Sequence, residues 1–178
     1  MDFKKYTAFF CEENIWQLTE SIPTELLGNF NVLFLTNESK SIAVMNQKAA
    51  QGQSHIIWDY HVILHDTKQK VIYDFDSTLG MTTDEEEYFY GTFGNQNALQ
   101  NNFRTKILAI PAKEYLQDFS SDRSHMIDET GKKVSPFPSW PKILQGTCLD
   151  LSMLMNLDKT ILNKYPLLPV DQYLNCHQ

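Results

Sequence analysis

Cys11 is the residue whose type and position best suit nucleophilic chemistry. It stands directly before Glu12 and Glu13, two carboxylates that favour the first turn of a helix. A thiol at a helix start meets unpaired backbone N–H groups and a positive partial charge, which lower its pKa and can hold a developing oxyanion. The alternative is that Cys11 is a small buried apolar residue, as free cysteines often are. Cys148 and Cys176 lack such a context and are interpreted as structural.

A histidine and an aspartate on two neighbouring strands could activate that thiol. Segments 56–65 and 71–76 alternate as strands do, and a four-residue loop at 66–69 would place His61 opposite Asp74. Opposed residues have Cβ atoms about 4.5–5.5 Å apart, so the carboxylate could orient the imidazole. A register shifted by two residues would instead place Asp76 opposite His61. A histidine facing an aspartate on a sheet is also a common structural pair, so both interpretations stay open.

Periodicity and turn signals predict the elements that position these residues. Ile15, Leu18 and Ile22 recur at three- and four-residue steps and predict a helix over 12–22, which ends before Pro23. Further predicted elements are strands at 32–35, 42–45 and 103–110 and a helix at 112–119 opened by Pro111. The acidic run 84–87 is interpreted as a solvated loop, and the leucine-rich segment 148–168 as part of the core.

Length and composition indicate one folded domain, 1–178, that needs neither disulfides nor a structural metal. The chain has 178 residues, of which 42% are hydrophobic, and its three scattered cysteines predict reduced thiols in a reducing compartment. A formal charge of −7 with dispersed basic residues argues against a nucleic-acid partner. The sequence shows no signal-peptide pattern and no run near the ~18–20 apolar residues of a membrane span. We therefore expect a soluble intracellular protein.

Several short motifs resemble those of the protein N-terminal glutamine amidohydrolases. Residues 58–62 spell WDYHV, the pentapeptide by which that family is known. The match extends to Tyr6, to the CEEN run at 11–14 with Trp16, and to Tyr73, Asp74 and Asp76. It also includes the SDRSHM run at 121–126. These motifs follow one another over roughly the first three quarters of the chain, whereas the resemblance is loose after about Lys132.

The resemblance implies an α/β fold of the α+β type, papain-like or transglutaminase-like, in which a helix carrying the nucleophilic cysteine packs on an antiparallel sheet. It implies that Cys11, His61 and Asp74 form a triad. The family's reaction converts an N-terminal glutamine of a protein or peptide to glutamate and releases ammonia, a step that feeds degradation signalled by the N-terminal residue. No metal or other cofactor is implied.

The expected partners are protein or peptide substrates with an N-terminal glutamine. Because the free amine of such a substrate is a cation, we expect carboxylates near the site, with Glu13 and Asp122 as candidates. A monomer in the cytoplasm is expected, with no nucleic-acid or membrane partner. Two other functions stay open at this point: another Cys-His-Asp enzyme, such as a peptidase or transglutaminase, or a non-catalytic binding module on the same fold.

Overall fold

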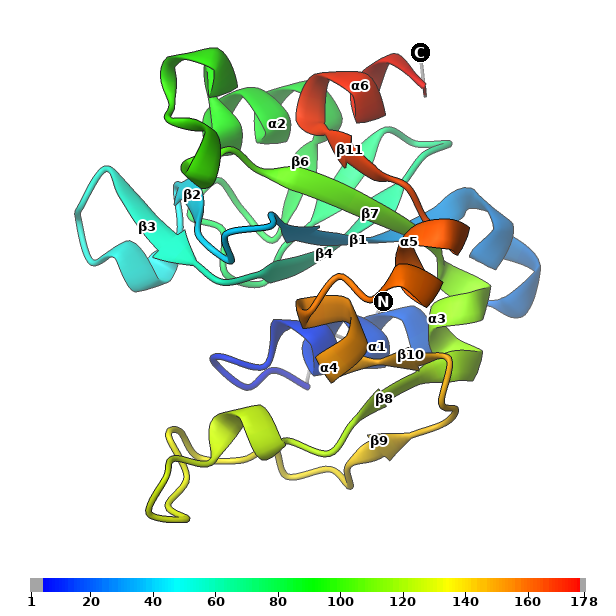
Figure 1. Ribbon diagram of the computed structural model, residues 1–178. Coiled ribbons are helices and arrows are strands. Elements are labelled where there is room, and N and C mark those ends of the chain that lie inside the picture. Colours follow the sequence, from blue (N-terminus) through cyan, green and yellow to red (C-terminus); the bar gives the residue numbers. More distant parts are fainter. Residues whose placement is uncertain (1–4, 177–178) are drawn as a thin grey trace.

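The computed structural model describes residues 5–176, which fold around a six-stranded antiparallel sheet (Figure 1). The strands lie in the order β11-β7-β1-β4-β5-β6. Their bounds are β1 (Phe30–Thr36), β4 (His61–Asp66), β5 (Val71–Tyr73), β6 (Thr82–Asp84), β7 (Lys106–Pro111) and β11 (Leu167–Pro169). The mixed helix-and-strand architecture with antiparallel pairing confirms the predicted class at this level.

Helices cover both faces of this sheet. Figure 1 shows helices on either side of it. One side carries α1 (Cys11–Glu20) and α3 (Ala112–Asp118), and the other carries α2 (Glu85–Phe93) and α6 (Val170–Asn175). The central strands are therefore buried on both faces, which explains why they read as continuous apolar runs in the sequence.

Smaller elements complete the chain. A two-stranded sheet joins β2 (Ile42–Met45) and β3 (His55–Trp58), and a three-stranded sheet joins β8 (Phe119–Ser121), β9 (Ile143–Leu144) and β10 (Leu149–Asp150). Two short helices follow, α4 (Leu151–Met155) and α5 (Lys159–Lys164). The 3₁₀ helices are η1 (Thr24–Asn29), η2 (Lys48–Ala50), η3 (Gln96–Ala98), η4 (Asn101–Phe103) and η5 (Ser124–Met126). Among the helices of residues 5–176, none has the length and apolar character needed to cross a membrane.

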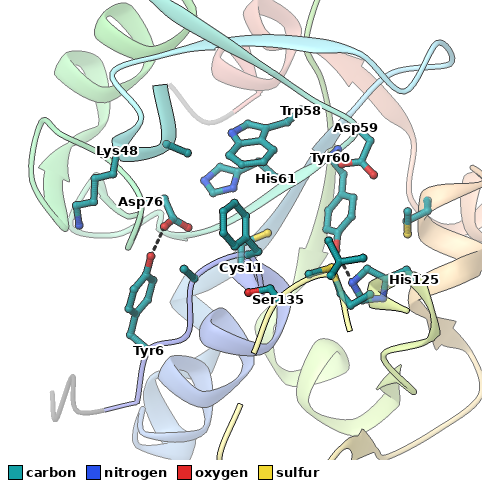
Figure 2. A pocket seen from close by; sticks show the side chains of 16 residues that line it. Tyr6, Cys11, Lys48, Trp58, Asp59, Tyr60, His61, Asp76, His125 and Ser135 are labelled. Atoms are coloured by element: carbon teal, nitrogen blue, oxygen red, sulfur yellow. Dashed lines mark hydrogen bonds between the residues drawn. The ribbon is translucent and has the colours of Figure 1, made fainter. Parts of the chain in front are cut away.

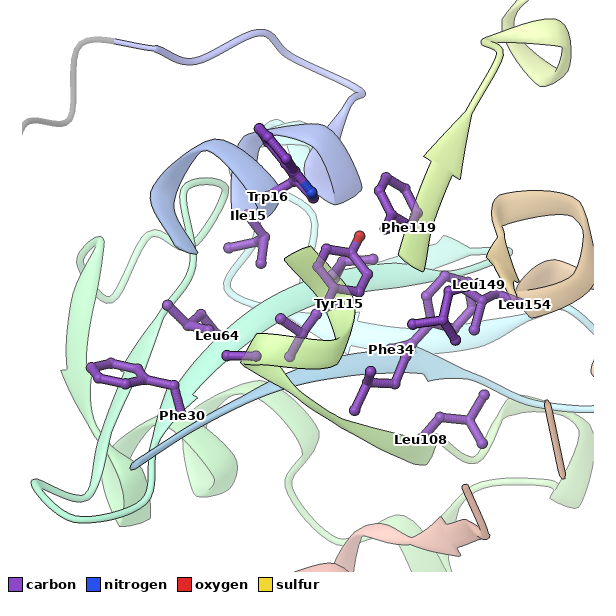
Figure 3. Packing of buried hydrophobic residues seen from close by; sticks show 14 of the residues in the cluster. Ile15, Trp16, Phe30, Phe34, Leu64, Leu108, Tyr115, Phe119, Leu149 and Leu154 are labelled. Carbon is purple, nitrogen blue, oxygen red and sulfur yellow. The ribbon is translucent and has the colours of Figure 1, made fainter. Parts of the chain in front are cut away.

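The two faces of the sheet contribute to two separate apolar clusters. Along β1, Val32 and Phe34 point into the cluster beneath α1 and α3, whereas Leu33 and Leu35 point into the cluster beneath α2 and α6. The larger cluster also includes residues of the C-terminal segment, which packs there as predicted (Figure 3). Figure 3 labels ten members of this cluster: Ile15, Trp16, Phe30, Phe34, Leu64, Leu108, Tyr115, Phe119, Leu149 and Leu154. This packing fixes α1 against the sheet.

The hairpin of β4 and β5 has a different register from the favoured prediction. Leu64 pairs with Tyr73 and Asp66 with Val71, two residues away from the register that places Leu64 opposite Val71. The reason is local, since one carboxylate oxygen of Asp66 accepts hydrogen bonds from the N–H groups of Lys68 and Gln69, at 3.0 and 2.9 Å. Asp66 therefore closes the last pair of the ladder, and the loop is 67–70 instead of 66–69.

The predicted strand 56–65 is divided into two strands that belong to different sheets. β3 pairs with β2, and β4 pairs with β1 and β5. The break falls at Asp59 and Tyr60, where the carboxylate of Asp59 accepts a hydrogen bond from the N–H of Tyr60 at 2.9 Å. The hydroxyl of Thr36 donates to the Asp59 carbonyl at 2.8 Å. His61 consequently stands at the first position of β4, at an end of the sheet.

The acidic run 84–87 is not the solvated loop predicted from the sequence. Asp84 caps α2, since its side chain accepts hydrogen bonds from the N–H groups of Glu86 and Glu87. The carboxylates after it occupy the first turn of that helix, where the helix dipole favours negative charge. Glu85 is buried.

Candidate active site

A pocket of about 480 Å³ opens where the start of α1 meets the start of β4 (Figure 2). Its walls come from the N-terminal segment, from residues 58–61, and from the loops around Lys48, Asp76 and His125. Cys11 and His61 both line it, and in Figure 2 the imidazole lies directly beside the thiol-bearing residue. The structure thus brings together a thiol and an imidazole that are fifty residues apart in the chain.

Cys11 is the first residue of α1 and lines the pocket. The backbone N–H of Val62, the residue after His61, faces the sulfur and lowers the pKa of Cys11. Phe10, at the N-cap position, provides no side-chain cap, and Asn14 instead ties the preceding turn by two hydrogen bonds to the backbone of Thr7, at 2.9 and 2.8 Å. The N–H of Cys11 is therefore not used by a side-chain cap.

The thiol is less acidic than the helix start alone predicts. Burial and the neighbouring carboxylate of Glu12 raise the pKa of Cys11 well above its ordinary value, and Asp76 adds to this effect. The Val62 N–H acts in the other direction but does not outweigh them. The sequence-based expectation of a lowered pKa is corrected here, because it considered the helix dipole and neither the burial of the thiol nor the two carboxylates. The sulfur consequently needs a base to take its proton.

His61 has its carboxylate partner in place. Its Nε2 lies 3.0 Å from Oδ1 of Asp74, and both side chains are buried. Burial alone would lower the pKa of His61, but the charge of Asp74 and this hydrogen bond raise it. Burial opposes ionisation of Asp74, yet the charge and hydrogen bond of His61, with further donors, lower the pKa of Asp74 to about 2. The pair is therefore arranged to stabilise a charged imidazolium against a carboxylate.

Asp74 reaches His61 although the ladder ends before it. β5 stops at Tyr73, and the N–H of Asp74 turns to the carbonyl of Met81 at 3.0 Å. The Asp74 carboxylate then accepts hydrogen bonds from Gln47 Nε2 at 3.1 Å, from the Tyr88 hydroxyl at 2.8 Å and from the N–H of Asp76 at 2.9 Å. The predicted contact between His61 and Asp74 is thus present. It is formed by the turn after β5 and not by the cross-strand pairing that the sequence predicted.

Asp76 stands at the edge of the pocket. The hydroxyl of Tyr6 donates to Oδ1 of Asp76 at 2.6 Å, and the Tyr6 ring stacks on Phe75. His61, Asp74 and Asp76 offer three ligand atoms within 4.8 Å of one another, so they are the residues of 5–176 that could hold a metal ion. The hydrogen bonds already made by the Asp74 oxygens favour an acid–base network over a chelate.

The two carboxylates predicted to meet a substrate amine lie elsewhere. Glu13 is fully buried, and its carboxylate accepts two hydrogen bonds of 2.7 Å from Arg123 and one of 2.7 Å from Trp140 Nε1. Asp122 is exposed, caps the N–H of Ser124 at 2.8 Å and lines a smaller neighbouring hollow. Neither lines the main pocket, because one is enclosed by Arg123 and the other is turned toward its own loop.

Sequence reasoning missed a second polar group beside Cys11, formed by Glu12, Tyr60 and His125. The Tyr60 hydroxyl lies 3.1 Å from Glu12 Oε2 and 3.4 Å from His125 Nε2. Tyr60 and His125 line the pocket, whereas Glu12 lies behind its wall. All three residues fall within the motifs noted in the sequence, but only the fold shows that they meet.

Comparisons with known proteins agree with the motifs. The model of the family described as N-terminal glutamine amidase matches residues 6–168, which includes most of the segment after Lys132. Three relatives carry the name protein N-terminal glutamine amidohydrolase. The one from Danio rerio is 38% identical over 163 residues, covering 88% of this chain and 78% of its own length. Those from Bos taurus and Homo sapiens are 36% and 35% identical, with 88% of this chain covered and 79% and 80% of theirs. The chain belongs to the N-terminal glutamine amidase family.

Proposed function

We propose that this chain hydrolyses the side-chain amide of an N-terminal glutamine, using Cys11 as nucleophile, His61 as acid and base, and Asp74 to orient His61. The relatives are named as amidohydrolases of N-terminal glutamine, which gives the reaction. The observation that carries the residue assignment is the shared pocket of Cys11 and His61, with Asp74 3.0 Å behind the imidazole. This is the arrangement of a nucleophile, a base and an orienting carboxylate.

In the first step His61 takes the proton of the Cys11 thiol, and the sulfur attacks the carboxamide carbon of the substrate. A raised thiol pKa makes this transfer necessary, and the carboxylate of Asp74 stabilises the imidazolium that results. The tetrahedral intermediate collapses when the C–N bond breaks, and His61 gives its proton to the departing ammonia. A thioester between Cys11 and the glutamyl side chain remains.

In the second step a water molecule attacks the thioester carbon while His61 removes its proton. The C–S bond breaks, the proton returns to the sulfur, and the product carries a glutamate side chain. The balance is one amide and one water converted to one carboxylic acid and one ammonia. Asp74 keeps the imidazole in the same tautomer throughout, because Gln47 and Tyr88 hold its carboxylate in place.

The oxyanion of each tetrahedral intermediate needs donors beside the sulfur. The backbone N–H of Cys11 is the first candidate, because the opening N–H groups of a helix have no intrahelical acceptor. The positive end of α1 adds to the stabilisation.

For the substrate amine, Asp76 replaces Glu13 and Asp122 as the favoured carboxylate. It lines the pocket, and only one of its oxygens is engaged by Tyr6. Exchanging Asp76 for Asn is expected to raise KM for a Gln-initiated peptide more than it lowers kcat. The same peptide with an acetylated N-terminus is expected to be a poor substrate of the unmodified protein. Equal turnover of the free and the acetylated peptide would contradict amine recognition.

We further infer a papain-like or transglutaminase-like scaffold within a single domain, 1–178. What supports it is α1, which begins at Cys11 and packs against β4 of the antiparallel sheet, with His61 on that strand and Asp74 just after the next one.

The test of the function is a Gln-initiated peptide incubated with the purified protein. We expect ammonia and a new carboxylate on the first residue, measured by an ammonia assay and by mass spectrometry, without chain cleavage or cross-linking. Cys11→Ala is expected to remove the activity, and Cys148→Ala, at an exposed cysteine outside the pocket, serves as the matched control. Cleavage or cross-linking would instead indicate a peptidase or transglutaminase, and activity in a folded Cys11→Ala protein would refute the assignment.

A further inference from the structure

Two consecutive glutamates follow Cys11, both fully buried, yet their surroundings differ. The charge of Glu13 is matched by Arg123. Among the described residues Glu12 has no such cation: Tyr60 donates to its Oε2 at 3.1 Å, and the thiol of Cys11 lies 3.7 Å from the same oxygen. Its Oε1 has no hydrogen-bond partner within 5–176, and the nearest basic atom is His125 Nε2 at 3.7 Å. A buried carboxylate without a partner is costly, whereas the neutral acid is not.

We propose that Glu12 is a positioning residue that acts through Cys11, with its neutral carboxyl supporting the sulfur as it becomes a thiolate and its ionised form opposing that change. The inference rests on the proposed role of Cys11 as nucleophile. It assigns a role to a side chain that contacts the sulfur and is neither His61 nor Asp74.

The protons balance without a further reactant. When His61 takes the thiol proton, a neutral Glu12 keeps its own proton. The Glu12 O–H can then donate to the thiolate at the contact where the thiol S–H donates to Glu12 before the transfer. If Glu12 is already ionised, the attack places two negative charges at that contact, which disfavours the thiolate. Burial raises the pKa of Glu12 to about 8, so the neutral form prevails at neutral pH.

The titratable groups that face Glu12 act in both directions. The hydrogen bonds from Tyr60 and Cys11 lower the pKa of Glu12, and the charge of Glu12 attracts a protonated His61 on β4, but burial outweighs the groups that lower this pKa. On α1 itself, Cys11 and Glu13 flank it, and the charge of Glu13 further raises the pKa of Glu12. From α3, the Tyr115 hydroxyl donates to the Glu12 backbone carbonyl at 3.1 Å. From the segments before β4 and at η5 come Tyr60 and His125, and burial lowers the pKa of His125, which favours its neutral form. Arg123 faces Glu13 instead.

The position of this group agrees with a role at the sulfur. In Figure 2, Tyr60 and His125 lie on one side of Cys11, and Tyr6 and Asp76 lie on the other. His125 is half-buried and lines the pocket, so protons can exchange between solvent and Glu12 by way of Tyr60 and His125 while Glu12 stays out of contact with substrate.

The decisive measurement is the pH dependence of Cys11 alkylation by iodoacetamide, in a background where Cys148 and Cys176 are replaced by serine. Glu12→Gln keeps the size and hydrogen-bonding capacity of the neutral acid and removes the charge. We expect its alkylation profile to shift toward lower pH by about one unit or more. Glu20→Gln removes a charge from the exposed end of the same helix and should follow the parent protein. Coincident profiles for the Glu12→Gln variant and the parent protein would overturn the proposal.

Two further readouts keep the test informative. Above about pH 8 the substrate amine loses its charge and Glu12 ionises, so kcat/KM of the parent should fall for both reasons, and the fall should be less steep in Glu12→Gln than in the parent and Glu20→Gln. If Glu12→Gln does not fold, infrared spectra of the parent at about pH 6 and about pH 9.5 should show a protonated carboxyl that is lost on titration. Its absence at the lower pH would refute the proposal. Alkylation does not require turnover, so this result is separable from a failure of the amidase assignment.

Discussion

Strand β4 carries two histidine–carboxylate pairs, and the pair of His61 borders the pocket of Cys11 whereas the pair of His65 does not. His61 Nε2 lies 3.0 Å from Asp74, and four residues along the same face His65 Nε2 lies 3.3 Å from Glu85. Both imidazoles are buried. The ring of His61 lines the pocket of Cys11, whereas Nδ1 of His65 is 2.7 Å from the Tyr173 hydroxyl beneath α6. A histidine hydrogen-bonded to a carboxylate therefore does not define a catalytic base, because access and a neighbouring nucleophile are needed as well.

The difference follows from position along the strand. His65 pairs with Asn31 of β1 and Ile72 of β5, so it is flanked on both sides and covered by α2 and α6. His61 is the first residue of β4, and β5 has ended before reaching it. His65 is thus enclosed in a hydrogen-bond network inside the sheet, whereas His61 borders an open pocket at the end of the sheet.

The largest expected effect separates the two histidines by activity. His61→Asn should lower kcat by about 10²–10⁴-fold, the contribution typical of a general acid–base group, and should also lower the unfolding free energy, because it removes a partner of the buried Asp74 carboxylate. His65→Asn should leave kcat within about twofold. It should lower the unfolding free energy by about 1–3 kcal/mol, because it leaves buried partners unsatisfied.

Steady-state ammonia release and urea unfolding measure the two quantities on the same preparations. A large loss of kcat in a fully folded His65→Asn protein would show that the sealed pair participates in the reaction, and the comparison between the pairs would then fail.

A second expected effect distinguishes the two aspartates near His61. Asp74→Asn should lower kcat strongly, by about 10²-fold or more, since Asn cannot stabilise the imidazolium that Asp74 faces. Asp76→Asn should act mainly on KM, because Asp76 borders the pocket and contacts Tyr6. Full Michaelis–Menten curves with a Gln-initiated peptide give both constants. A larger loss of kcat from Asp76→Asn would mean that Asp76 is the carboxylate that orients the base.

Much of the framework could be predicted because it depends on local pattern. The strand at 42–45, the core of β1 and the helix at 112–118 follow from apolar runs and proline signals. The alternation of faces along 60–65 is likewise confirmed, with Val62 and Leu64 in one cluster and Ile63 in the other. Such patterns indicate which face of a helix or strand packs against the core, and this does not depend on distant residues.

The predictions of register and strand length that were wrong depended on single hydrogen bonds. The turn bonds of Asp66 shift the hairpin register by two residues, and the bond inside Asp59–Tyr60 divides one predicted strand into two. The surroundings of Glu13 could not be foreseen either, because Arg123 lies 110 residues away in the chain. Spacing identified which residues take part in the site, but tertiary contacts decide which of them face the pocket.

The smallest expected effect concerns stability in acid. The folded pKa of Asp74, about 2, lies below its unfolded value of about 3.9, so the buried pair stabilises the fold above about pH 4. This contribution, ~2 kcal/mol, is lost as pH falls from about 4 through about 2, because the unfolded chain then binds the proton more readily. His61 acts in the opposite window, since its raised pKa adds stability below about pH 6.5 that is lost as pH rises through the folded value.

Urea unfolding at several pH values should show the acid loss in the unmodified protein. Asp74→Asn should have a flatter curve below about pH 4, and so should His61→Asn, because removing His61 takes away the main group that lowers the Asp74 pKa. The double variant should match the single ones instead of adding to them, since the pair is one unit. A wild-type slope in His61→Asn would mean that Gln47 and Tyr88 alone hold Asp74 ionised, and His61 would then be oriented by the carboxylate without stabilising it in return.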